Sequence, residues 1–75
     1  MTWKLFGPRK IDQSIIRVLL DRMPSQCTTN EIVTALDRAD HRASVARTYF
    51  ALLRLERKEQ IASTKMEGEV FWRLL

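Results

Sequence analysis

A mostly helical domain that ends in a β-hairpin is the fold class that this sequence predicts, and two observations predict it. Apolar residues recur at helical spacing in three segments, at roughly 9–23, 29–37 and 42–57. Two segments of alternating polarity follow at about 60–65 and 69–74, separated by a glycine turn. Three helices and a hairpin in this order are the layout of a winged helix-turn-helix, a fold that commonly places its third helix in the major groove of DNA.

The size and composition of the chain predict one globular domain. We expect the 75 residues to form a single winged-helix domain over 1–75, with 1–7 as an N-terminal arm. Hydrophobic residues make up 45% and charged residues 29%, which is typical of a soluble protein. The chain has neither an apolar run of about 20 residues nor a signal-peptide pattern. We therefore expect a cytoplasmic protein with no membrane partner, either a monomer or a homodimer.

The first helix is predicted by a proline at each end and an apolar stripe between them. Pro8 suits the first turn of a helix, and Pro24 excludes helical conformation at the residue before it. The stripe consists of residues spaced by four, three and one: Ile11, Ile15, Val18 and Leu19. The lone Cys27 follows this helix. We expect it to be a small buried apolar residue between the first two helices, because it has no partner for an internal disulfide.

The second helix begins with a capping box. The Thr28 hydroxyl can accept a hydrogen bond from the amide of Glu31, and the Glu31 carboxylate can accept one from the amide of Thr28. A polar connection follows, in which Asp40 or Ser44 is expected to cap the third helix. His41 lies in or beside this connection, and we expect it on the surface.

The third helix carries the residues that predict function. On a helical wheel, one side is apolar and is expected to be buried: Val45, Ala46, Tyr49, Leu52 and Leu53. The other side is expected to be exposed: Ser44, Arg47, Ala51, Arg54 and Lys58. Short side chains between long cations let a helix approach base edges closely. A solvated face with arginines for solubility would give the same pattern.

The distribution of charge supports a polyanionic partner. The net charge is +4, and the positive excess lies in residues 1–25 and 41–58. We expect double-stranded DNA as the partner, with Arg47 and the neighbouring small polar residues reading bases and the remaining cations holding phosphates. The predicted DNA-binding residues are Arg42, Ser44, Arg47, Thr48, Arg54, Lys58 and Lys65.

Sequence motifs for catalysis are absent. The chain has no glycine-rich phosphate loop and no Gly-x-Ser-x-Gly nucleophile elbow. His41 and Cys27 cannot make a Cys/His metal cage, and the acidic residues are scattered beside basic ones. We therefore expect a binding protein rather than an enzyme, with no cofactor and no metal.

The run Val45-Ala46-Arg47-Thr48-Tyr49, followed by aliphatic residues and Leu55-Glu56, resembles the small winged-helix regulators of fimbrial operons, the PapI/FaeA-like family. The Thr-Thr-x-Glu-Ile start of the second helix and the aromatic pair Phe71-Trp72 also match. The resemblance implies transcriptional control of a bacterial operon, with Arg47 facing DNA. It also implies a larger DNA-binding regulator on the same DNA as a further partner.

Two departures from that family leave a second interpretation open. The family has a glycine between the third helix and the first strand, where this chain has the longer stretch 57–60, and its wing is basic, where this chain has Glu67 and Glu69. Aligning on the end of the third helix instead of its start would expose Phe50 and Leu53. The alternative function is therefore a winged-helix protein–protein interaction module, docking this surface or the N-terminal arm onto a larger regulator, a polymerase or a replication factor.

Overall fold

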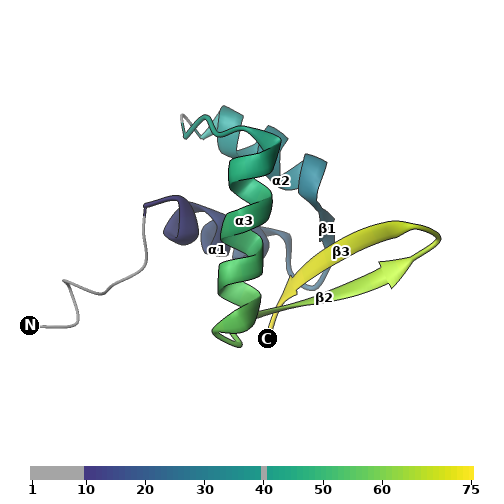
Figure 1. The fold of residues 1–75 in the computed structure, drawn as a ribbon. Helices are drawn as coiled ribbons and strands as arrows, with labels where there is room; N and C mark the ends of the chain where they lie inside the picture. Colours follow the sequence, from purple (N-terminus) through teal and green to yellow (C-terminus); the bar gives the residue numbers. More distant parts are fainter. Residues whose placement is uncertain (1–9, 40) are drawn as a thin grey trace, which may run out of the picture.

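The computed structural model describes residues 10–39 and 41–75, and within them it has the predicted architecture. Figure 1 shows the helices gathered on one side of the molecule, with the hairpin projecting from their base. The elements in chain order are α1 (Lys10–Arg22), β1 (Cys27–Thr28), α2 (Thr29–Arg38), α3 (Val45–Arg57), β2 (Ile61–Met66) and β3 (Glu69–Leu74). The predicted fold class, three helices followed by a β-hairpin wing, is confirmed. The predicted N-terminal arm and the Asp40 cap lie outside the described residues.

The ends of α2 follow the sequence signals closely. Thr28 is its N-cap, and both hydrogen bonds of the predicted capping box are present, at 3.2 Å from Glu31 N to Thr28 Oγ1 and 2.8 Å from Thr28 N to Glu31 Oε1. These bonds satisfy amide groups that the first turn of a helix leaves without intrahelical partners. The capping box therefore fixes where α2 begins.

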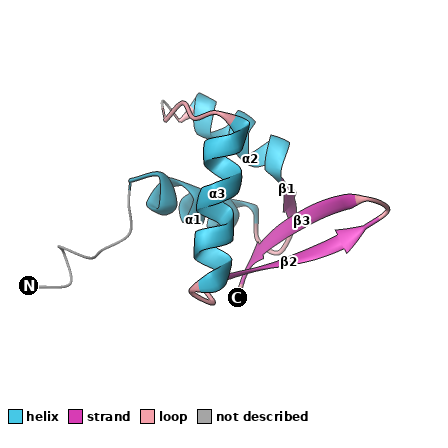
Figure 2. Ribbon diagram, in the orientation of Figure 1, coloured by secondary structure: helices cyan, strands magenta, loops and turns pink. Residues whose placement is uncertain are grey.

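A third strand joins the hairpin, and the sequence analysis did not predict it. The sheet is antiparallel in the order β1-β3-β2 (Figure 2). Cys27 lies opposite Trp72 and Thr28 opposite Phe71. Two residues are too short a segment to show a period-two pattern, so β1 leaves no sequence signal. Its effect is to hold the start of α2 against the base of the wing.

The core lies where the three helices meet the inner face of the sheet. It includes Ile15 and Leu19 of α1, Ile32 and Leu36 of α2, Leu52 and Leu55 of α3, and Ile61 and Trp72 of the sheet, each at most 1% exposed. Val70 and Leu74 pack against this cluster from the same face of β3 as Trp72, as the alternation of β3 predicted. None of the described helices is both long and apolar enough to cross a membrane.

Candidate nucleic-acid interface

The N-terminus of α3 is fixed by a serine cap. The helix begins at Val45, three residues later than predicted, because Ser44 has extended dihedral angles and its Oγ accepts a hydrogen bond from the Arg47 amide at 3.0 Å. The loop before it is tied to the helices by the His41 amide, which donates to the Leu36 carbonyl. His41 Nδ1 also lies 3.0 Å from Ser14 Oγ of α1, so this residue is half-buried instead of on the open surface.

The exposed face of α3 differs from the predicted one. Thr48 and Ala51 were expected on the exposed side, yet both are 0% exposed, whereas Tyr49 is 41% exposed and Val45 51% exposed. The prediction is therefore wrong by about one residue, roughly 100° around the helix axis. The small side chains of Thr48 and Ala51 face the core because they let α3 pack closely on its neighbours, and the larger side chains are directed outward.

The corrected face combines apolar and basic side chains. Ala46 and Phe50 are one helical turn apart and exposed, and Phe50 is 63% exposed. Arg47 is exposed beside them, and Arg57 is exposed on the same side at the end of the helix. No acidic residue occurs in the first turn of α3. Alignment on the end of the helix predicted the exposure of Phe50 correctly, but its prediction for Leu53 is wrong, because Leu53 is half-buried and packs against the core.

Arg54 is not a free cation on this face. Its Nη2 donates a hydrogen bond of 2.7 Å to Oδ1 of Asp12 in α1, whose side chain is 1% exposed. The predicted placement of Arg54 among the exposed residues is therefore wrong, because the guanidinium neutralises a buried carboxylate. Asp12 was missed as a core residue. Its signal was a position in line with Ile15 and Leu19, at i, i+3 and i+7.

The remaining predicted contacts are exposed but spread over the molecule. Arg42 lies before α3 and forms an ion pair of 2.9 Å with Asp37, in which both side chains face solvent. Lys58 is the C-cap of α3, so about 16 Å of helix separates it from Arg47. Lys65 is exposed on β2, opposite Val70. The structure thus brings Arg42, Ser44 and Arg47 together near the N-terminus of α3 and leaves the two lysines apart from them.

A row of aromatic rings connects the core to the exposed face of α3. The Trp72 indole is buried and its Nε1 donates to Thr29 Oγ1 at 3.0 Å. Tyr49 packs edge-on against Trp72 with ring centroids 6.3 Å apart, and the Phe50 ring lies tilted to Tyr49 at a centroid distance of 6.3 Å. The three rings thus form a chain of aromatic contacts from the core to the surface of α3.

The wing ends in an acidic turn. Glu67 and Gly68 both have positive φ, of 51° and 81°, between the paired residues Met66 and Glu69. A two-residue turn of this kind matches the twist of a hairpin and explains the glycine. Glu67 and Glu69 are exposed at this tip, where carboxylates would be repelled by phosphates.

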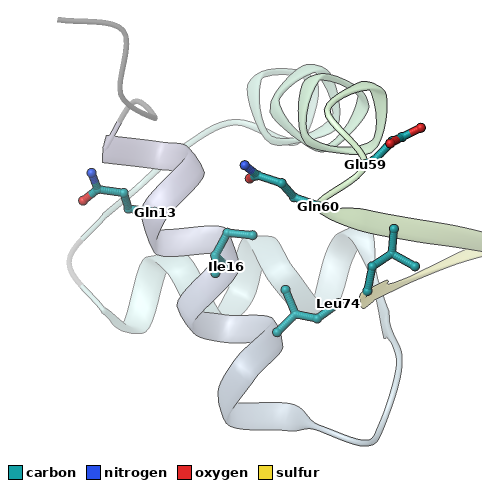
Figure 3. A pocket seen from close by; sticks show the side chains of 6 residues that line it. Gln13, Ile16, Glu59, Gln60 and Leu74 are labelled. Atoms are coloured by element: carbon teal, nitrogen blue, oxygen red, sulfur yellow. The ribbon is translucent and has the colours of Figure 1, made fainter. Parts of the chain in front are cut away.

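A shallow hollow of about 520 Å³ lies between α1 and the base of the hairpin, and the sequence did not indicate it. Figure 3 shows its lining, with Gln60 extending toward α1 and with Ile16 and Leu74 supplying apolar surface. Gln13 and the exposed Leu75 complete its rim. No titratable pair or metal-binding group lines it among the described residues.

Cys27 is buried as predicted, at 1% exposure in β1. Burial raises the pKa of its thiol, with the Arg22 charge opposing and the Glu31 charge adding to the shift. The thiol is therefore protonated at neutral pH. In the part of the chain that the structure describes, no group of three or more His, Cys, Asp or Glu could hold a metal ion.

Comparison with solved structures shows the fold of ferric uptake regulators. The structure of the Helicobacter pylori ferric uptake regulator Fur, described as having three functional metal-binding sites, matches 99% of this chain with a TM-score of 0.80 and 21% identity. The ferric uptake regulator of Francisella tularensis, solved with iron, matches 88% of this chain with a TM-score of 0.79 and 15% identity. The match covers 51% of each of those proteins. No protein-family model and no curated protein sequence matches the chain.

Proposed function

We propose that this chain is a DNA-binding transcriptional regulator of winged-helix type whose α3 enters the major groove. The observation that carries the proposal is Arg47, an exposed arginine in the first turn of a capped helix that has no acidic residue in that turn. The N-terminal residues of a recognition helix are those that contact base edges, and arginine is the commonest reader of guanine. The fold shared with two proteins named as regulators supports the same function.

The proposed DNA contacts are those predicted residues whose side chains are exposed. Arg47 reads a base, with Ser44 beside it, and Arg42, Lys58 and Lys65 hold phosphates. Both side chains of the Arg42–Asp37 pair are exposed, at 89% and 55%, so releasing Arg42 to a phosphate costs little. Thr48 and Arg54 are left out of the proposed set because the first is buried and the second neutralises Asp12. The described residues do not fit a metal site, and no metal belongs to the proposal.

The resemblance to regulators of fimbrial operons gives the narrower form of the proposal. It rests on the Val45-Ala46-Arg47-x-Tyr49 motif and implies a larger DNA-binding regulator on the same DNA. The chain spans about half the length of each matched ferric uptake regulator, so the responses of those proteins are not carried over.

A titration of fluorescent duplex DNA with the full chain tests this function. Three to five neutralised phosphates predict that log K falls with log salt at a slope of about −3 to −5. On a duplex selected by the protein from a random pool, Arg47→Ala is expected to weaken binding by roughly ten-fold, which is about 1.4 kcal/mol. Arg17→Ala, which removes an exposed arginine of α1, is the matched control and should bind like the parent. Absence of salt-dependent binding would overturn the proposal.

A second candidate is a protein–protein interaction module, and the 63% exposure of Phe50 favours it. Exposed aromatic side chains are common anchors of protein interfaces. Under this function, Phe50→Ala would abolish binding to the protein partner, whereas Arg47→Ala would leave duplex binding unchanged.

A further inference from the structure

Phe50 is the most unusual residue on the proposed DNA-facing surface. A large aromatic side chain that is 63% exposed leaves apolar area in contact with water, and burying that area in a complex is favourable. Ala46 lies one turn before it on the same face. Resting on the DNA-binding function proposed above, we propose that Phe50, with Ala46, reads the 5-methyl groups of thymines in the major groove.

The major groove of DNA presents an apolar group that suits this exposed apolar surface. Thymine is the base that presents a methyl group in the major groove, and alanine and phenylalanine side chains are suited to contact it. An apolar face of this kind discriminates against cytosine, whose exposed amino group would lose hydrogen bonds to water when covered. In this proposal, Arg47 and the adjacent apolar surface read the DNA sequence together. The DNA sequence is therefore predicted to have a guanine next to thymines.

The structure presents this surface in a defined orientation. Phe50 is supported by Tyr49, and Tyr49 by the buried Trp72, whose indole is anchored to Thr29 Oγ1. An aromatic side chain has only two side-chain dihedral angles, so ordering it on binding costs little conformational entropy. Basic side chains lie on either side of the apolar surface, Arg47 near the start of the helix and Arg57 at its end, and α3 has no acid in its first turn. This charge arrangement suits a polyanion better than an apolar protein surface.

Substitution of thymine by deoxyuridine tests the inference, because the two bases differ at this edge only by the methyl group. Duplexes are first selected by the full chain from a random pool, and each thymine of the winning duplex is then replaced singly. We expect one or two positions at which deoxyuridine weakens binding by about three- to four-fold, the effect of one lost methyl contact. Phe50→Ala should lose this preference for thymine at one or more of these positions, namely those that Phe50 rather than Ala46 contacts.

The control variant is Leu20→Ala, which deletes another exposed apolar side chain, 57% exposed on α1. It should retain the preference of the parent for thymine. If every deoxyuridine duplex binds the parent as well as the thymine duplex does, the inference is wrong while the DNA-binding function stands. Salt-dependent binding without enrichment of any sequence would also overturn it. If no duplex binds at all, the proposed function itself fails, and Phe50 belongs to a protein interface.

Discussion

Asp12 of α1 and Arg54 of α3 form a partly buried ion pair. Asp12 is 1% exposed on its side chain and Arg54 32% exposed, and the bond between them links α1 to α3. Among the described residues, the other oxygen of Asp12, Oδ2, and Nε of Arg54 have no hydrogen-bond partner. In the described part of the chain, the negative charge of Asp12 is therefore neutralised by the guanidinium of Arg54 alone, and removing that guanidinium leaves a buried charge unpaired.

Arg54→Ala is accordingly expected to destabilise the fold rather than weaken DNA binding selectively. We expect the free energy of unfolding to fall by about 3 kcal/mol, a large part of the stability of so small a domain. Urea unfolding followed by circular dichroism measures this change. Arg57→Ala, at an exposed position of the same helix, is the matched control and should change stability by less than about 0.5 kcal/mol.

The double variant Asp12→Leu with Arg54→Met separates the role of the charge from that of packing. Replacing both partners by apolar side chains removes the unpaired carboxylate, so most of the lost stability should return. If Arg54→Ala is no more destabilising than Arg57→Ala, the ion pair does not hold α3 in place.

At the level of elements, α3 ends in a defined pattern of backbone hydrogen bonds. The Glu59 amide donates to the Glu56 carbonyl at 2.9 Å and the Gln60 amide to the Leu55 carbonyl at 3.1 Å. This is a Schellman motif, and it places Glu59 in the left-handed region with φ of 61°. Glycine is the residue that adopts this conformation without strain, and this chain has a glutamate at that position.

Glu59→Gly is therefore expected to stabilise the protein, by about 1 kcal/mol, because it relieves the strain of a non-glycine residue at positive φ. Thermal unfolding should show a rise in Tm of a few degrees. Lys58→Gly is the control, since Lys58 has a negative φ of −83° and gains nothing from the exchange. A lower Tm for Glu59→Gly would contradict the assigned helix end.

Local signals in the sequence predicted the helices and the hairpin, whereas tertiary contacts determine which face of α3 is buried. The capping box of α2 and the glycine turn of the wing depend on neighbouring residues, so the sequence reveals them. The orientation of α3 depends on how closely it packs against α1 and α2, which favours Thr48 over Tyr49 in the core. No pattern within α3 carries that information. The ion pair between Arg54 and Asp12, which lies 42 residues earlier, could likewise not be predicted from a helical wheel of α3 alone.

At the scale of the whole molecule, α1, α2 and the sheet pack against α3. The core joins α3 to α1, α2 and the sheet, while Arg47 and Phe50 lie outside it. The acidic tip of the wing, with Glu67 and Glu69, is separate from this surface in sequence and opposite in charge. We therefore expect α3, rather than the wing, to provide the main contact with DNA.

The central claim, that the exposed face of α3 contacts duplex DNA, is tested most directly by mapping the interface in solution. Amide chemical shifts of the ¹⁵N-labelled chain would be recorded while an unlabelled duplex is added at low salt. The account predicts that the largest changes occur at residues 42–50, with smaller ones at Arg57 and Lys58. Changes confined to the α1 surface around Leu20, or to the tip of the wing, would contradict it.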